Sequence, residues 1–329
     1  MLAEGTLYRD RPEDRRPAPS LFTSPGWIAA IEATYGVDFH CTGAAGGAQV
    51  VCLFDDALGP RMVAPAYGDY AERCPAEGLA GRIASVRDAF PAHPLAVKVA
   101  GEATIDAPIS RDALLHEVPL GEGDGEPKTA FLRLARQAER AGLTVTARTD
   151  AAAVEDFYAL YAAQRLTRFG LLPQPVAFFR HVAGNFFGSG EGALWEARAD
   201  GRPAAYLFIL TVDDVAYYKF GCADPDALGL RPNNLLFRHV LDRAREEGRM
   251  RLDLGLTPSG NEGLARFKRS MGAREMTLRT FSLPPLDGAA PDTGSRRALL
   301  GEITRTVVEG EPSVEAASAC GAALYRYFA

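Results

Sequence analysis

The second half of the chain has an order of secondary-structure signals that few folds satisfy. Two helical patterns, the second beginning at Pro175, precede three strand-like runs, which lie at 193–199, 204–212 and 215–221. Asp200-Gly201 is a tight-hairpin signal between the first two runs, and Asp213-Asp214 separates the second from the third. A helix, a strand, a helix and a closing strand follow. This order predicts an α/β (α+β) domain with a mixed, mostly antiparallel sheet flanked by helices.

The first half also mixes helices and strands, although its order is less distinctive. Ser24 is a fair N-cap for a helix that extends to about Tyr35, and a second helix is expected over 78–90. Short strands are expected at 49–54, 61–64 and 95–100. The chain has 329 residues, which suits two domains of roughly 150 residues each. The predicted domains are residues 1–145 and 146–284, followed by a tail over 285–329.

Charge and cysteine content narrow the possible partners and locations. Lys and Arg number 36 against 42 Asp and Glu, a net charge of −6, which argues against DNA or other non-specific nucleic-acid binding. Five scattered cysteines without a C-x-x-C pair fit neither a disulfide framework nor a zinc site. No apolar run is long enough for a membrane span, and residues 1–20 lack the apolar core of a signal peptide. We expect a cytoplasmic protein with a mobile amino-terminal lead-in.

Several short stretches carry a family resemblance that covers nearly the whole chain. In the second half they are GRPAA (201–205), YYKFG (217–221), PNNLL (232–236), LDLG (252–255) and NEGLARFKRSMGA (261–273). In the first half they are LFTSPGW (21–27) and APAYGDY (64–70). With these stretches the sequence resembles the FemAB-like transferases, a family of tandem GNAT domains. The resemblance implies two GNAT-like domains, with the tail packing back on the first.

The resemblance also implies acyl or aminoacyl transfer and names catalytic candidates. An amine attacks an activated carbonyl, and the oxyanion that forms must be stabilised by groups already in place. In aminoacyl-transferring relatives the Phe-Lys pair lies at the acyl end of the donor, so Lys268 would stabilise the oxyanion and Phe267 would line the pocket. Helical spacing alone instead favours a core phenylalanine and a solvated lysine at these two positions.

Tyrosine and carboxylate side chains supply the other candidates for the reaction and for the acceptor. Tyr217 and Tyr218 alternate across a strand that splays from its neighbour in GNAT folds, and Tyr218 is our catalytic candidate. Asp253, a further catalytic candidate, ends a strand, and Asp69 and Tyr70 lie in a first-domain turn as acceptor-binding candidates. Either aspartate would accept a proton or orient the amine. The alternative for both aspartates is turn capping.

Polar residues at two helix starts are candidates for donor binding. Asn261 and Glu262 open one helix, where Asn261 alternatively serves as a simple cap. Arg231, Asn233 and Asn234 open another, and one of the two asparagines is expected to cap it. A typical GNAT has R-x-x-G-x-G or R-x-x-G-x-A in this loop as a pyrophosphate cradle. Here no glycine follows Arg231 at that spacing.

Two donors therefore remain open, aminoacyl-tRNA and acyl-CoA, with no tightly bound cofactor and no metal. Arg165 and Arg168 are candidate acceptor-site cations that would contact anionic groups. The missing glycines favour aminoacyl-tRNA, whereas the acidic net charge favours acyl-CoA. The expected activity is transfer to a primary amine on a small molecule or peptide. The alternatives are an acyl-CoA-dependent N-acetyltransferase acting on a metabolite or saccharide amine, and a degenerate GNAT pair that only binds a ligand or partner.

Overall fold

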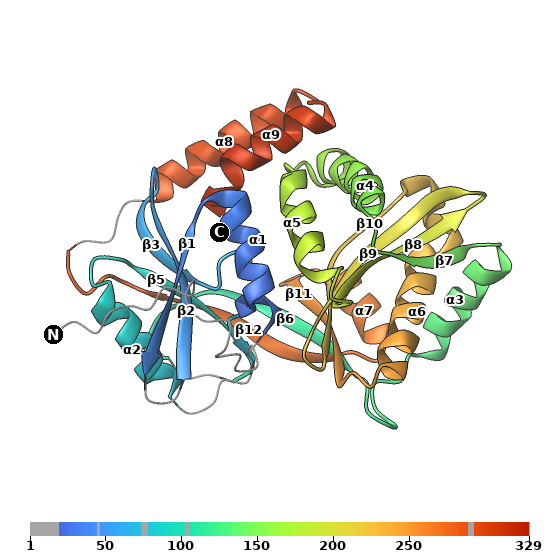
Figure 1. Cartoon of the computed structure of the whole chain (residues 1–329), viewed down its shortest axis with the longest axis horizontal. Helices are drawn as coiled ribbons and strands as arrows, with labels where there is room; N and C mark the ends of the chain where they lie inside the picture. The colour runs from blue at the N-terminus through green and yellow to red at the C-terminus, as the bar shows by residue number, and fades with distance from the viewer. Residues whose placement is uncertain (1–19, 45–46, 74–77, 103–104, 289–292, 329) are drawn as a thin grey trace. The chain divides into compact units, whose positions relative to one another are not determined.

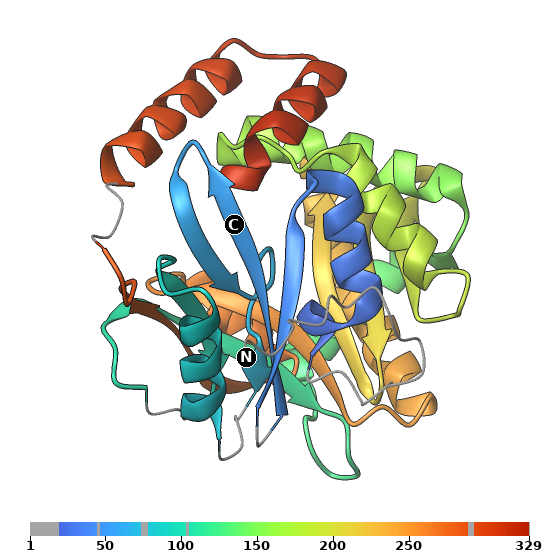
Figure 2. The same ribbon diagram turned by 60° about the vertical axis from the view of Figure 1, so that its left-hand side comes forward.

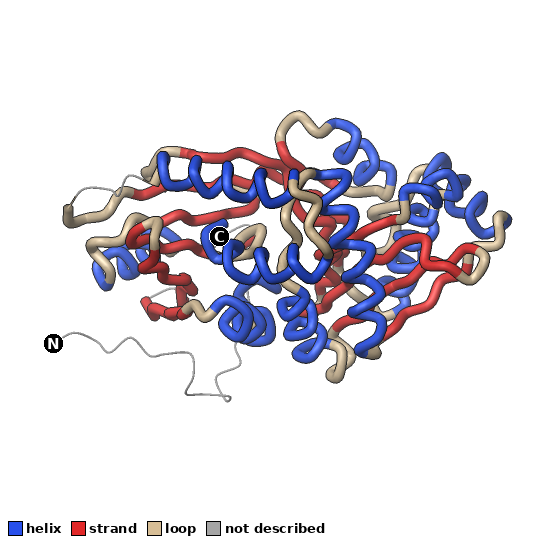
Figure 3. The backbone as a smooth tube through the Cα atoms, turned by 90° about the horizontal axis from the view of Figure 1, so that it is seen from above, coloured by secondary structure: helices blue, strands red, loops and turns tan. Residues whose placement is uncertain are grey.

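The computed structural model describes residues 20–44, 47–73, 78–102, 105–288 and 293–328, and these mix helices and strands throughout (Figures 1 and 3). The predicted lead-in, up to residue 19, lies outside the described residues. The chain divides into two compact units. Unit 1 takes in the chain up to Leu114, Met276–Ile303 and the end from Leu324; unit 2 is Leu115–Glu275 with Thr304–Ala323. None of the described helices is long and apolar enough to cross a membrane.

Unit 1 is a mixed sheet with helices packed on it. Its strands follow the order β1 (Asp38–Ala44), β2 (Gly47–Asp56), β3 (Gly59–Ala64), β5 (Leu95–Ala100) and β12 (Arg274–Leu283), with the short β4 (Glu72–Arg73) beside β5. The pairs β3–β5 and β4–β5 are parallel, and the pairs β1–β2, β2–β3 and β5–β12 are antiparallel. Helix α2 (Leu79–Ala89) covers this sheet with Leu79, Ile83 and Val86 (Figure 2). The i, i+4 and i, i+3 spacing of those residues explains why one face of α2 is buried.

An aromatic cluster anchors the amino-terminal helix of unit 1. Helix α1 (Pro25–Tyr35) follows the 3-10 turn η2 (Leu21–Thr23) and begins at its predicted cap, where the Trp27 N–H donates to Ser24 Oγ at 3.4 Å. Phe22 contacts Trp27 and Tyr70 edge-on, at ring-centroid distances of 5.7 and 5.3 Å. All three rings are fully buried, so this cluster is a core of the unit.

Unit 2 is built on a four-strand antiparallel meander extended by one parallel strand. Its order is β11 (Arg251–Pro258), β10 (Val215–Ala223), β9 (Arg202–Val212), β8 (Gly192–Ala199) and β7 (Thr144–Arg148). The part of β6 (Ile109–Pro119) that belongs to unit 2 lies on the other edge of β11. Asp200 and Gly201 both have positive φ, 49° and 74°, which confirms the predicted tight hairpin between β8 and β9.

Strand β9 separates two cores because its side chains alternate across the sheet. Ala205, Leu207 and Ile209 join the core formed with α6 (Pro232–Glu246) and α3 (Thr129–Arg140). On the other face Phe208 contacts Phe157 at 5.7 Å, within an aromatic core under α4 (Ala151–Phe169) and α5 (Val176–Phe186). Figure 1 shows these two helix pairs around the meander. A sheet buried on both faces explains the continuous apolar run of β9.

Three features differ from the sequence expectations. No strand was predicted at β1 or β6; β6 starts with four exposed residues, so it lacks the alternation that marks a half-buried strand. The predicted boundary at residue 145 lies inside unit 2, where Ala138 and Leu143 pack on Leu235 of α6. The tail contains α8 (Gly294–Glu309), α9 (Val314–Leu324) and the turn η4 (Tyr325–Phe328), and it is divided between the units rather than belonging to the first alone.

Candidate active site

Strand β10 separates from its parallel neighbour β11 after the first three of its nine residues. The two strands pair at Val215–Arg251, Ala216–Leu252 and Tyr217–Asp253, and the register ends there. On its other side β10 keeps pairing with β9 as far as Ala223, with a bulge between Tyr218 and Phe220. Beyond Tyr217 one edge of β10 therefore has no strand beside it. Bulges of this kind re-aim side chains, and they occur often next to active sites.

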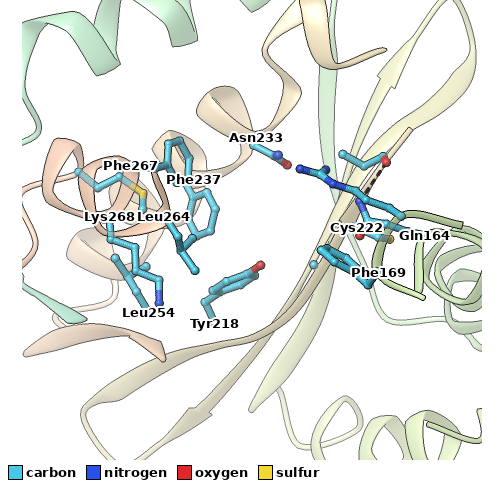
Figure 4. A pocket seen from close by; sticks show the side chains of 14 residues that line it. Gln164, Phe169, Tyr218, Cys222, Asn233, Phe237, Leu254, Leu264, Phe267 and Lys268 are labelled. Carbon is cyan, nitrogen blue, oxygen red and sulfur yellow. Dashed lines mark hydrogen bonds between the residues drawn. The ribbon is translucent and has the colours of Figure 1, made fainter. Parts of the chain in front are cut away.

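A pocket of about 230 Å³ lies at this separation, entirely within unit 2 (Figure 4). Helix α4 lines it with Gln164, Arg168 and Phe169, and β10 with Tyr218 and the run from Gly221 to Ala223. The remaining lining residues come from α6, β11 and the segment that begins with α7 (Glu262–Ser270): Asn233, Phe237, Leu254, Leu264, Phe267, Lys268 and Met271. Ligand pockets usually enclose roughly 300–1,000 Å³, so this one fits the reacting end of a substrate rather than a whole donor.

Tyr218 presents a hydroxyl group to the pocket. Its ring packs edge-on against Phe237 at 4.9 Å, and within the described part of the chain the hydroxyl has no hydrogen-bond partner. Figure 4 shows the hydroxyl directed away from Lys268, toward the gap between the Lys268 side and the Gln164–Phe169 side. Burial raises the pKa of Tyr218, with a smaller contribution from Cys222. The hydroxyl therefore stays protonated at neutral pH, where it can donate a hydrogen bond or pass its proton to a more basic leaving atom.

Lys268 is buried at the inner end of the pocket, with 3% of its surface exposed. Its Nζ donates to the carbonyl oxygens of Gly255 and Leu256 at 2.8 and 2.9 Å, which ties α7 to the end of β11. Lys268 is therefore not a solvated helix charge. The neighbouring Phe267 both lines the pocket and packs on Phe237 at 5.7 Å.

A buried histidine that the sequence analysis did not identify lies behind Lys268. His116, on β6, is fully buried; its Nε2 lies 3.0 Å from Glu275 Oε1 and its Nδ1 lies 3.1 Å from Thr257 Oγ1. Burial lowers the pKa of His116, the positive charge of Lys268 lowers it further, and Glu275 opposes both. A neutral ring with Nε2–H donating to Glu275 and Nδ1 accepting from Thr257 satisfies every group. In the sequence, 141 residues separate His116 from Thr257, so no local pattern indicates the pair.

Two predicted donor-binding residues have structural partners instead. Asn261 Oδ1 accepts from the Leu264 N–H at 3.2 Å, so Asn261 is the N-cap of α7. Glu262 is exposed and pairs with Arg269 at 2.7 Å. Among the catalytic candidates, Asp253 is buried on β11, and its Oδ1 accepts from the Gly255 N–H at 2.7 Å. None of these three side chains lines the pocket.

Helix α6 does not begin with the asparagine cap that the sequence predicts. The helix begins at Pro232, and Arg231, exposed with φ of 64°, occupies the N-cap position without a side-chain cap; neither asparagine caps it. The Asn234 N–H donates to the Arg231 carbonyl at 3.1 Å, and the Asn234 side chain is buried away from the pocket. Pro232 has no N–H. In the first turn only Asn233, which lines the pocket, keeps an N–H without a partner in the described structure.

The four acceptor candidates fall into different places. Arg168 lines the pocket with its guanidinium 5.5 Å from the Phe169 ring, whereas Arg165 donates to the Leu172 carbonyl at 3.4 Å and does not line it. Asp69 and Tyr70 belong to unit 1. Tyr70 is fully buried against Phe22, so its side chain cannot contact an acceptor directly.

Comparison with known proteins gives the class to which this site belongs. Residues 128–269 match the family model described as acetyltransferase (GNAT) domain, and this range lies within unit 2. The crystal structure of FemX is similar with a TM-score of 0.59 and 12% identity, over 80% of this chain and 93% of FemX. The structure of L-PGS from Bacillus licheniformis is similar with a TM-score of 0.52 and 12% identity, over 89% and 99% of the two chains. Comparison with curated proteins finds no match.

Residues 128–269 are therefore a GNAT acetyltransferase domain, and the chain is an acyltransferase. At 12% identity the two solved structures show likeness of fold alone, and that likeness extends over 80% and 89% of this chain. Acyl or aminoacyl transfer is accordingly the general activity, and the pocket beside Tyr218 lies inside the matched domain.

Substituting Gly221 by alanine should close the pocket from its β10 side. A Cβ at Gly221 would lie 2.5 Å from the Tyr218 hydroxyl oxygen, so the tyrosine ring must move. We expect the Tyr218 ring resonances of tyrosine-labelled protein to shift, with little change in melting temperature. Gly229→Ala is the matched control, because a Cβ there meets nothing within 4 Å. Unchanged Tyr218 resonances in Gly221→Ala would contradict this placement of the ring.

Protonation of His116 should destabilise the fold as the pH falls. The folded state lowers the pKa of His116, so below about pH 6.5 the unfolded chain binds more protons and stability decreases on acidification. We expect His116→Gln to lose part of this decrease in thermal melts between pH 7.5 and 5.5. His239→Gln, at an exposed position of α6, serves as control. If the melting temperatures of wild type and His116→Gln fall in parallel with pH, His116 does not cause the loss of stability.

Proposed function

We propose that this protein is an N-acyltransferase that moves an acyl or aminoacyl group from an activated donor to a primary amine. The observation that supports this most directly is that the Tyr218 hydroxyl and the Lys268 ammonium line one pocket, at the point where β10 leaves β11. One group can give a proton and the other supplies a fixed positive charge. Acyl transfer needs both, one at the leaving group and one near the developing oxyanion.

The proposed reaction begins with the acyl carbonyl of the donor in the pocket. The amine nitrogen attacks the carbonyl carbon, and the carbonyl oxygen takes the electron pair as an oxyanion. Lys268 stabilises this charge electrostatically, since its ammonium is held by the Gly255 and Leu256 carbonyls and needs no reorganisation. Collapse breaks the carbon–sulfur or carbon–oxygen bond to the leaving group. Tyr218 protonates the leaving atom, and the proton that the amine loses returns through water to the Tyr218 oxygen.

The roles of the remaining candidate residues follow from their positions. Phe267, which packs on Phe237, forms part of the wall beside the acyl group. Arg168 and Asn233 line the pocket with a guanidinium and an amide, and we assign them to polar parts of the donor or acceptor. Asp253 keeps the turn after β11 in place through Gly255, which makes it a positioning residue. Asp69 stays a proposed acceptor contact of unit 1.

The start of α6 bears on the choice of donor. A pyrophosphate cradle at a helix start needs several backbone N–H groups that point at the anion. Pro232 supplies none, and the N–H groups of Asn234 and Leu235 donate to the Arg231 carbonyl. This geometry favours a donor that is not held by the usual CoA cradle, so aminoacyl-tRNA is the first candidate and acyl-CoA the second.

Paired binding titrations with the full chain test the donor. With aminoacyl-tRNA as donor, we expect saturable binding of charged tRNA that weakens steeply as the salt concentration rises, because phosphate contacts release counterions. Acetyl-CoA should bind weakly. Micromolar or tighter acetyl-CoA binding would instead establish the second candidate. A protein that binds neither donor would favour a ligand-binding module over an enzyme.

Replacing Tyr218 with phenylalanine tests the proposed proton donor. The change removes only the hydroxyl group, so the ring contact with Phe237 stays. We expect the turnover rate for the accepted donor to fall by roughly 10²–10⁴-fold, with a smaller change in KM, because a general acid acts in the transition state. Tyr217→Phe is the matched control, since neighbouring residues of a strand point to opposite faces. Full activity in Tyr218→Phe would remove Tyr218 from the mechanism.

A further inference from the structure

The pocket carries positive charge and apolar surface but no carboxylate. Its charged lining residues are Arg168 and Lys268, and no Asp or Glu of the described chain lines it. The carboxylates of β11, α7 and β12 are engaged elsewhere. Glu262 pairs with Arg269, Glu275 lies against His116 and Arg269, and Asp253 accepts from the Gly255 N–H.

The inner end of the pocket is mostly hydrocarbon. Leu254, Leu264 and Met271 line it together with the Phe237 and Phe267 rings, whose centroids lie 5.7 Å apart at 68°. Lys268 contributes its ammonium at the same end, held by the two carbonyls of β11. Figure 4 shows Leu254, Leu264, Phe267 and Lys268 together on one side of the pocket, and Asn233 apart from them.

We propose that this end holds the distal part of the donor's acyl group, beyond any α-amino group, and accepts only acyl chains whose distal part carries no positive charge. The proposal rests on the proposed transferase function and deepens it, because it names the class of group transferred. Each acyl methylene buried here should raise affinity roughly fourfold. An ammonium on the acyl chain would lose its water without gaining a carboxylate, and it would be repelled by Lys268.

Two small amides test the acyl end independently of catalysis. Hexanamide and 5-aminopentanamide have the same number of heavy atoms and differ by a terminal methyl against a terminal ammonium. Each is titrated into protein labelled with ¹³C at the methionine methyl groups, where Met271 reports on the pocket and the buried Met62 of unit 1 is the internal control. We expect saturable Met271 shifts with hexanamide at an affinity at least tenfold higher than with 5-aminopentanamide, and a silent Met62. Equal affinities, or no Met271 response to either amide, would overturn the proposal.

A charge-swapped variant makes the same test in the opposite direction. Leu264 occupies the third position of α7, where the helix dipole favours a negative charge, so Leu264→Glu is expected to fold. The new carboxylate should reverse the preference, with 5-aminopentanamide binding more tightly than hexanamide. Leu264→Gln has the same size without the charge and should weaken hexanamide binding without any such reversal. A Leu264→Glu protein that still prefers hexanamide would overturn the proposal.

The outcome separates this inference from the proposed function. The amide titrations followed at Met271 test the charge preference of the acyl pocket. The turnover rate of Tyr218→Phe tests the transfer mechanism. If Tyr218→Phe keeps full activity while hexanamide still binds tenfold more tightly, the mechanism fails and the pocket assignment stands. If the amides bind equally while Tyr218→Phe is inactive, the assignment fails and the transferase mechanism stands.

Discussion

The separation of β10 from β11 is the constraint on which the rest of the site depends. A strand inside a sheet normally uses both edges for backbone hydrogen bonds, and an edge left without a partner is costly unless something polar meets it. Here β10 pairs with β11 only as far as Tyr217, so the next residues border a pocket instead of a strand. A substrate carbonyl or amide that enters can meet backbone groups that are already fixed. Fixed groups of this kind are what stabilise an oxyanion without reorganisation.

The separated strand end is held open by polar contacts on its far side. Lys268 binds the carbonyls of Gly255 and Leu256 just after the last paired residue of β11, and Thr257, the next residue along, lies 3.1 Å from His116. The lysine and the histidine therefore fix one short segment from two directions. Their proximity also explains why the pKa of His116 is lowered, since burial and a neighbouring cation both disfavour a second positive charge. The contacts of Lys268 and His116 thus hold the end of β11 in place, and they leave Lys268 as the charged group of the pair.

The two cores of unit 2 make this site rigid. Residues of β9 alternate between the α3–α6 face and the α4–α5 face, and both faces are fully covered by helices. The pocket walls are extensions of these cores, because Phe237 and Phe267 belong to the α6 side and Phe169 ends α4. Side chains locked by packing lose little entropy when a substrate binds. A pocket with such walls selects its ligand by shape and charge, which is why the absence of a lining carboxylate has consequences for the acyl group.

The sequence by itself determined the local elements and the class of fold. Asp200-Gly201 specified a hairpin, Ser24 a helix start and the second-half motifs a GNAT-like domain, because turns, caps and motifs depend on neighbouring residues. Only the tertiary structure decided which side chains meet. It placed Tyr218 and Lys268 on one pocket, engaged Asp253, Asn261 and Glu262 elsewhere, and buried Tyr70 in another core. It also brought His116 to Thr257 across 141 residues. Such contacts depend on how strands and helices pack, so the order of neighbouring residues in the sequence does not predict them.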